Sequence, residues 1–181
     1  MARLAPGDST PDFDTVDLFG DPVQLSDFRD RKLMLSFYRY AACPLCNLRV
    51  HDLIERHSGL AAMGLAIVAV FQSPPETIRK YVGRQDAPFP IIPDPSMAHY
   101  RRYRVERSWP GLFKVIKHRK DEFTLAADKG FKPGWINGPI NRIPADFLID
   151  GHGKLRTCFY GADIGDHIPL ELVEAFAANA G

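Results

Sequence analysis

Residues 36–53, SFYRYAACPLCNLRVHDL, decide the fold of this chain. An apolar, aromatic-rich run over residues 33–38 leads into a turn of small residues, and so short a run is typical of a buried strand. Two cysteines follow in the spacing C-P-L-C, where an amphipathic pattern begins. Pro44 suits the first position of a helix, because its missing N–H is not needed there. The segment predicts a strand, a turn and a helix that begins at the cysteines.

The start of this helix gives Cys43 a chemical role. Unpaired backbone N–H groups and the positive end of the helix dipole would both favour its thiolate, the form that attacks disulfides and peroxides. Cys46 lies one helical turn further on, close enough to be a disulfide partner. The pair therefore predicts a redox site.

Other interpretations of the two cysteines are packing and metal binding. A buried cysteine often fills space in a core, and a C-x-x-C can be half of a zinc site. Zinc would need two more ligands, yet neither a second C-x-x-C nor an H-x-x-x-H follows. Haem attachment requires a histidine directly after the second cysteine, where this chain has Asn47. We expect redox chemistry and no metal.

Composition limits the class of protein. The 181 residues are 45% apolar and 25% charged, which fits one globular domain over residues 1–181. The net charge of +1 gives no indication of a nucleic-acid partner. Residues 101–120 nevertheless hold eight Lys or Arg against Glu106 alone. Such a run is most often a solvated face, with an anion-attracting rim or a subunit contact as alternatives.

The cysteine count and the N-terminal segment indicate a compartment. Three cysteines cannot form a closed set of structural disulfides. The first residues contain no apolar run long enough for a signal peptide or a membrane span. We expect a cytoplasmic protein with no membrane partner, in which a C-x-x-C is more often catalytic than structural.

Hydrophobic patterning predicts an α/β fold. A hairpin is expected from Phe13 to Leu25, with its turn at Gly20–Asp21. Strands alternate with helices along most of the chain, which implies parallel pairing in a layered α/β sandwich. The expected strands are about 32–38, 65–71, 89–92, 146–150 and 155–160, and the expected helices are about 44–60, 74–84, 96–103 and 170–178.

Residues 105–142 fit this alternation poorly. Trp109–Pro110–Gly111 is expected to break the chain, a helix is expected over 112–127, and an irregular Gly- and Pro-rich loop follows. So long a connection is usually functional or an interface. It carries five large aromatic residues, too many for a solvated loop: Trp109, Phe113, Phe123, Phe131 and Trp135. We favour a homodimer contact, with a lid over the cysteines as the alternative.

Several stretches together resemble the peroxiredoxins of the alkyl hydroperoxide reductase and thiol-specific antioxidant (AhpC/TSA) group. They are PGDSTPDF (6–13), QLSDFRDRKLMLSFYR (24–39), IVAVFQSPPETIRKYV (67–82), FPIIPDPS (89–96) and ADFLIDGHGKL (145–155). The resemblance implies a thioredoxin-like α/β fold: a central mixed sheet flanked by helices, an N-terminal β-hairpin extension and, in this chain, a long insertion at about 105–142.

The resemblance also implies residue roles. Cys43 falls on the peroxidatic cysteine, and Cys46 would be the resolving or second redox thiol. Three positions depart from the pattern. Tyr40 replaces a Thr or Ser that contacts peroxide, Ser36 replaces a Pro, and Pro144 stands where an Arg is usual. Arg142, two residues before Pro144, is the candidate replacement for that arginine.

Pro144 resembles a second signature. The Ile143–Pro144 step looks like the cis-proline that packs beside C-x-x-C in thioredoxin-like thiol oxidoreductases. The alternative is an ordinary trans proline that opens an edge strand. The candidate substrate-site residues are therefore Tyr40, Pro44, Arg142 and Pro144.

Three functions remain open. The first is hydroperoxide reduction through Cys43 with Cys46 as second thiol, which needs no bound cofactor but an external reductant such as thioredoxin or glutathione. The second is thiol–disulfide exchange by the Cys43–Cys46 pair beside Pro144. The third is a non-catalytic redox-responsive or structural binding protein, which predicts a Cys43 pKa near the ordinary 8.5. Cys158 is expected to be an inert buried thiol, with resolving thiol as the alternative.

Overall fold

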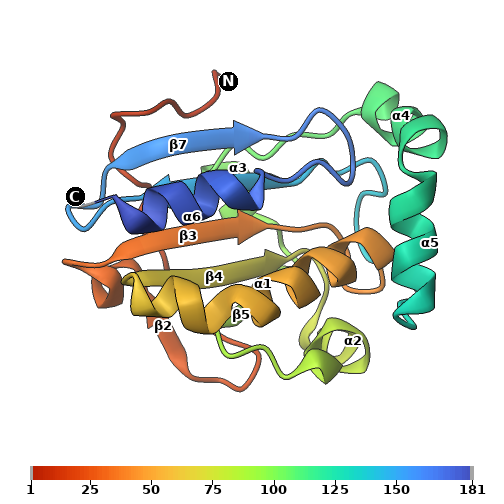
Figure 1. Cartoon of the computed structure of the whole chain (residues 1–181), viewed down its shortest axis with the longest axis horizontal. Coiled ribbons are helices and arrows are strands. Elements are labelled where there is room, and N and C mark those ends of the chain that lie inside the picture. The colour runs from red at the N-terminus through yellow and green to blue at the C-terminus, as the bar shows by residue number, and fades with distance from the viewer. Residues whose placement is uncertain (1, 180–181) are drawn as a thin grey trace.

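A five-stranded mixed sheet forms the centre of the molecule (Figure 1). The computed structural model describes residues 2–179, apart from the side chains of residues 116–118. The strand order is β5-β4-β3-β6-β7. The strands are β3 (Lys32–Phe37), β4 (Leu65–Phe71), β5 (Ile91–Pro93), β6 (Ala145–Ile149) and β7 (Leu155–Tyr160). The predicted central mixed sheet flanked by helices is confirmed.

The sheet divides into a parallel and an antiparallel half. β3 pairs parallel with β4, and β4 pairs parallel with β5, as strands joined by crossover helices do. β6 pairs antiparallel with β3 and with β7. β4, LAIVAVF, is buried along its whole length because both faces of the sheet are covered.

Alternate side chains of β3 enter two different cores. Met34, and Tyr38 directly after the strand, pack into a core with Cys43 and Cys46. Leu33, Leu35 and Phe37 pack into a second core on the opposite face. This alternation follows from the two-residue period of a strand, and it means that the cysteines belong to one face of the sheet only.

Helices cover both faces. Figure 1 shows α1 (Pro44–Ala62) and α6 (Leu170–Ala178) on the near face. That face carries the cysteine core, to which α2 (Pro75–Lys80) and the short 3-10 helix η2 (Val82–Gln85) contribute Ile78 and Val82. The second core contains Tyr100 of α3 (Ala98–Arg102) and the N-terminal Leu4 and Phe13.

The N-terminal hairpin is confirmed. β1 (Asp14–Val16) and β2 (Pro22–Gln24) pair antiparallel, and the 3-10 helix η1 (Leu25–Phe28) follows. Asp17 accepts hydrogen bonds from the backbone N–H groups of Phe19 and Asp21, at 2.8 and 3.0 Å, and so stabilises the turn.

The prediction for residues 109–127 is wrong in two ways. Trp109–Pro110–Gly111 does not break the chain but begins α4 (Trp109–His118), because Ser108 caps that helix by accepting from the Gly111 N–H at 3.0 Å. Proline is tolerated in the first turn of a helix, where its N–H would have no partner. The single expected helix is in fact two, since α5 (Lys120–Asp128) begins after Arg119. An irregular segment then runs to β6, as expected.

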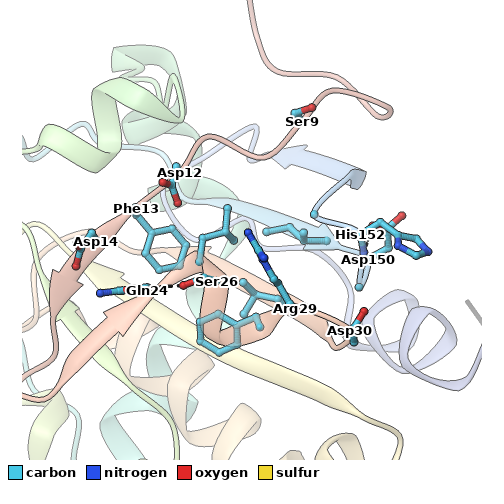
Figure 2. A pocket seen from close by; sticks show the side chains of 16 residues that line it. Ser9, Asp12, Phe13, Asp14, Gln24, Ser26, Arg29, Asp30, Asp150 and His152 are labelled. Atoms are coloured by element: carbon cyan, nitrogen blue, oxygen red, sulfur yellow. Dashed lines mark hydrogen bonds between the residues drawn. The ribbon is translucent and has the colours of Figure 1, made fainter.

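A cavity of about 640 Å³ lies at the start of β3, and Figure 2 shows the side chains that line it. Its wall includes Asp12, Arg29 and His152 but no residue of the C-P-L-C motif. Because Cys43 follows the other end of β3, this cavity is separate from the cysteine site. No helix within residues 2–179 has the length and apolar character that crossing a membrane requires.

Candidate active site

The turn after β3 places Cys43 at the N-terminus of α1. Cys43 is the N-cap residue, with φ −75° and ψ 120°, and Pro44 occupies the first helical position, as predicted. The Cys43 N–H donates to the carbonyl oxygen of Tyr40 at 3.0 Å, which closes the turn. The side chain of Asn47 donates to the carbonyls of Ala41 and Cys43, at 2.7 and 2.9 Å, and fixes the first turn of the helix.

The guanidinium of Arg39 contacts the Cys43 sulfur. Its Nη1 donates to Cys43 Sγ at 3.2 Å, and its Nη2 donates to the carbonyl oxygen of Ile140. The guanidinium also stacks on the ring of Tyr40, with 4.9 Å between Cζ and the ring centroid. Arg39 is only 2% exposed, so this cation meets the sulfur with little water between them.

These surroundings make Cys43 acidic. Burial raises the pKa of its thiol, but hydrogen bonds from Cys46 and the positive charge of Arg39 outweigh burial and lower the pKa to about 6. The opposite holds for Cys46: burial, followed by its hydrogen bond to Cys43 and the negative charge of that sulfur, raises its pKa. The pair is therefore a thiolate beside a protonated thiol, which is the asymmetry that an attacking and a second thiol require.

Tyr40, a candidate substrate-site residue, lies beside Arg39 in the turn before Cys43. Burial and the negative charge of Cys43 raise the pKa of its phenol to about 12. Tyr40 therefore keeps its proton at neutral pH and remains a hydrogen-bond donor.

Arg142 does not reach the sulfur, contrary to its assignment as the replacement arginine. Its Nη1 donates to the carbonyl of Val105 at 2.7 Å, and its Nη2 lies 3.1 Å from the sulfur of Met97. Its guanidinium stacks on the Tyr100 ring. Gln72 connects the two arginines indirectly, because it contacts Arg142 Nε at 3.4 Å and donates to the carbonyls of the segment just before Arg142. Arg142 thus stabilises the segment 137–142, whose Ile140 carbonyl accepts from Arg39.

The cis-proline interpretation of Pro144 is also wrong. Among residues 2–179 no peptide bond is cis. The alternative is correct in that Pro144 is trans and directly precedes β6, but β6 is not an edge strand, because it lies between β3 and β7. The carbonyl of Pro144 accepts from the Gly161 N–H at 3.0 Å, so this residue anchors the end of the β6–β7 ladder.

Cys158 belongs to the other face of the sheet. It packs against the second core, whereas both cysteines of the motif belong to the first. Burial and the charge of Asp8 raise the pKa of the Cys158 thiol to about 11. The inert role fits this position better than that of an intramolecular resolving thiol.

A polar network lies beneath the site on the Cys43 face. Ser36 donates to the buried carboxylate of Asp146, which also accepts from the Ile168 N–H at 2.8 Å and contacts His167 Nδ1 at 3.1 Å. Burial raises the pKa of Asp146, but the charge of His167 and these hydrogen bonds outweigh it and lower the pKa. Ser36, which departs from the family pattern, is here a structural partner for this carboxylate.

Arg39 is the functional residue that the sequence analysis missed. The available signal was an arginine between two tyrosines, four residues before Cys43, in a stretch that is otherwise buried. Charged side chains are almost never fully buried unless they are paired, so this arginine required a partner. Among the described residues, no cluster of three or more His, Cys, Asp or Glu side chains is arranged to hold a metal ion.

Comparison with known proteins finds relatives over nearly the whole chain. A sequence model described as the AhpC/TSA family matches residues 6–158. The protein named "Putative peroxiredoxin Rv2521" from Mycobacterium tuberculosis is 32% identical over 166 residues, which are 92% of this chain and 91% of that protein. Peroxiredoxin Bcp from Escherichia coli is 24% identical over 167 residues, 92% of each chain.

A solved structure is similar in fold. The crystal structure of peroxidoxin BcpB from Mycobacterium tuberculosis matches with a TM-score of 0.70 and 17% identity, and the match covers 97% of each chain. At this level of identity the likeness concerns the fold, and it supports the predicted thioredoxin-like α/β architecture.

Proposed function

Because the chain belongs to the AhpC/TSA family and is a thiol-based oxidoreductase of the peroxiredoxin type, we propose that it reduces hydroperoxides. Cys43 is the attacking thiolate and Cys46 the second redox thiol. The observation that carries the proposal is the Arg39 guanidinium, 3.2 Å from the Cys43 sulfur at the start of α1.

The first step transfers one oxygen atom. The Cys43 thiolate attacks the terminal oxygen of ROOH, the O–O bond breaks, and RO⁻ leaves and takes up a proton to become ROH. Cys43 is oxidised to sulfenic acid. Arg39 holds the sulfur as a thiolate, and the protonated phenol of Tyr40 supplies a hydrogen-bond donor close to the reacting atoms.

The second step forms a disulfide. The Cys46 sulfur attacks the Cys43 sulfenic acid, the S–O bond breaks, and water leaves with the Cys46 proton. Two sulfurs must approach to about 2.05 Å in a disulfide. Because Asn47 N–H donates to the Cys43 carbonyl at 3.0 Å in the first helical turn, that turn must loosen for the bond to form.

Stopped-flow measurement with hydrogen peroxide and an organic hydroperoxide tests the proposal. Reduced protein should consume both in one rapid equivalent, and Cys43→Ser should lose the reaction. If Cys43→Ser consumes peroxide as fast as the unchanged chain, the peroxidase assignment is wrong. The matched control is Cys158→Ser, which removes a thiol from the other face of the sheet.

Thiol–disulfide exchange is the second candidate, and the thiolate–thiol pair in the C-x-x-C favours it. It predicts insulin or glutathione-disulfide reduction and a Cys43–Cys46 disulfide with a measurable reduction potential. A Cys43–Cys158 bond in the oxidised protein would argue against it. The non-catalytic alternative expects an ordinary Cys43 pKa, which a value of about 6 does not support.

The proposal extends to partners. An external thiol reductant such as thioredoxin or glutathione would return the disulfide to the dithiol, and the cytoplasm would supply one. A homodimer through the 105–142 segment is supported by Trp109 and Phe113, which are 58% and 64% exposed on α4. The lid alternative is supported by the Ile140 carbonyl, which accepts from Arg39.

Light scattering tests the dimer contact. Phe113→Ser should shift the chain toward the monomer if α4 forms the contact. Phe19→Ser is the matched control, because Phe19 is 78% exposed in the distant β1–β2 turn. A chain whose mass is the same in all three forms has no dimer contact at Phe113.

A further inference from the structure

A small basic cavity lies beside the redox helix. Its volume is about 230 Å³, and it opens between the first turn of α1, the 80–85 region and the segment that follows α5. Its wall includes Asn47, the residue after Cys46. The hydrogen bond of Asn47 to the Cys43 carbonyl joins this wall directly to the redox turn.

Four cations line the cavity, and its lining contains no acidic residue. They are Lys80, Arg84, Lys129 and Lys132. Within residues 2–179 none of the four forms an ion pair with a described carboxylate. The Lys129 ammonium instead donates to His51 Nε2 at 2.8 Å. Four unpaired positive charges around one hollow repel one another, and an anion relieves that repulsion.

The remaining lining is polar and aromatic. Gln85 donates its amide to the backbone carbonyl and the side-chain oxygen of Asn47, both at 3.2 Å. Its own oxygen is buried with no partner among the described atoms, which leaves an acceptor for an N–H or ammonium group. The apolar surface consists of the rings of Tyr81 and Phe131. The cavity therefore offers no apolar groove for a long acyl chain. Its lining fits a compact molecule that carries carboxylates and N–H donors.

The cavity wall is held in place. A Cβ atom at Gly134 would lie 2.3 Å from the hydroxyl of Tyr81, so a larger residue there would have to displace that ring. The Trp135 N–H donates to the same hydroxyl at 3.3 Å. Phe131 packs edge-on against His51 of α1, with ring centroids 5.9 Å apart. The hollow is thus a feature of the folded chain.

We propose that this cavity binds the carboxylates of a small anionic thiol that reduces the oxidised enzyme. The proposal rests on the proposed function, which supplies the Cys43–Cys46 disulfide. The thiolate RS⁻ attacks one sulfur of that disulfide, the S–S bond breaks, and the other cysteine leaves as a thiolate. A second RS⁻ attacks the mixed disulfide and releases RSSR and the second cysteine thiolate. Two thiols are thereby oxidised for each disulfide reduced.

Glutathione and uncharged 2-mercaptoethanol are the probes. Protein oxidised by one equivalent of hydrogen peroxide, with its disulfide verified by mass spectrometry, is reduced by each thiol in turn. The test variant is Arg84→Gln/Lys132→Gln, because neither side chain forms a hydrogen bond with a described residue. The control is Lys114→Gln/Lys120→Gln, which removes the same charge from exposed positions outside the cavity lining.

The expected result is selective. The cavity variant should be reduced by glutathione about 10-fold more slowly, because two charge contacts are lost, and by 2-mercaptoethanol within about 2-fold of the unchanged rate. Raising the salt concentration should slow reduction of the unchanged chain by glutathione and leave its reduction by 2-mercaptoethanol unchanged. The control variant should change neither rate by more than about 2-fold.

Several outcomes overturn the inference. In one, glutathione and 2-mercaptoethanol reduce the cavity variant more slowly by the same factor. In another, glutathione reduces the cavity variant as fast as the unchanged chain. A third is slower reduction by thioredoxin with unchanged reduction by glutathione, which would make the cavity a protein contact. A fourth is slower first turnover with a carboxylate-bearing hydroperoxide, which would make it a substrate site. First-turnover peroxide consumption, measured separately, shows whether the proposed function itself stands.

Discussion

Cys43 and Cys158 are two thiols on opposite faces of one sheet, and burial raises the pKa of both. One nevertheless has a pKa of about 6 and the other about 11. The difference lies in what each sulfur faces. Cys43 occupies the N-cap position of α1 and its sulfur accepts a hydrogen bond from Arg39, whereas Cys158 lies in β7 near the negative charge of Asp8. The acidity of each thiol in this chain is therefore set by local charge and helix position, and not by burial alone.

The largest expected effect is a contrast in alkylation. At pH 7 about nine in ten Cys43 sulfurs and about one in 10⁴ Cys158 sulfurs are thiolates. The ratio of the two thiolate fractions is therefore about 10⁴. A thiolate of lower pKa is the weaker nucleophile, and this lowers the expected ratio of rates by about 10²-fold. We expect iodoacetamide to modify Cys43 about 10²-fold faster than Cys158, as read by peptide mass spectrometry.

The pH dependence sharpens this test. Modification of Cys43 should rise through pH 6 and level off by about pH 7.5, because its pKa is lowered to about 6. Modification of Cys158 should still be rising at pH 10, because its pKa is raised to about 11. If the alkylation rates of Cys43 and Cys158 depend on pH in the same way, the predicted difference between their pKa values is wrong.

Removing Arg39 should give the next largest effect. Arg39→Gln deletes the cation beside the sulfur, so the Cys43 pKa should return toward the ordinary value of about 8.5. On a full return, the thiolate fraction at pH 7 would fall from about nine in ten to about three in a hundred. The stronger nucleophilicity of the less acidic thiolate would offset about 10-fold of that loss, so the first-turnover rate at pH 7 should fall about 3-fold while the pH–rate profile moves to higher pH. A pH–rate profile by stopped flow measures both.

Two companion variants identify the cause. Arg39→Lys keeps the charge and should restore part of the pKa shift. Arg142→Gln removes a buried arginine that does not contact the sulfur, and it should change the Cys43 pKa far less than Arg39→Gln does. If Arg142→Gln shifts the profile as far as Arg39→Gln, the role assigned to Arg39 is incorrect.

Cys46→Ser should have a smaller effect on the first turnover. The hydroxyl can still donate to the Cys43 sulfur, so the rate should fall by less than about 3-fold. The oxidised product should change, because sulfenic acid would persist where the unchanged chain forms a disulfide. Trapping with a sulfenic-acid reagent and mass spectrometry distinguishes the two products.

Cys158→Ala should have the smallest effect. Because Cys158 packs on the other face of the sheet, first turnover and recycling should both stay within about 2-fold. Truncating a half-buried side chain should cost about 1 kcal/mol of unfolding free energy, measured in urea. Loss of recycling with intact first turnover would make Cys158 the resolving thiol of an intermolecular mechanism.

The sequence by itself determined the strand–turn–helix around Cys43, the parallel half of the sheet and the N-terminal hairpin. Each depends on signals within a few residues: a buried apolar run, Pro44 at a helix start, and turn residues at Gly20–Asp21. The asymmetry of the two cysteines could be anticipated for the same reason, since a helix N-terminus is a local feature.

Only the tertiary structure decided which arginine serves the sulfur, because that depends on a loop a hundred residues away. The Ile140 carbonyl holds Arg39 against Cys43, whereas Arg142 is drawn to Val105 and Met97. The trans bond at Pro144, the split of residues 109–128 into α4 and α5, and the basic cavity beside Asn47 likewise arise from long-range contacts. Spacing along the chain fixes which residues can meet locally, but packing between distant segments selects which charges face the same sulfur.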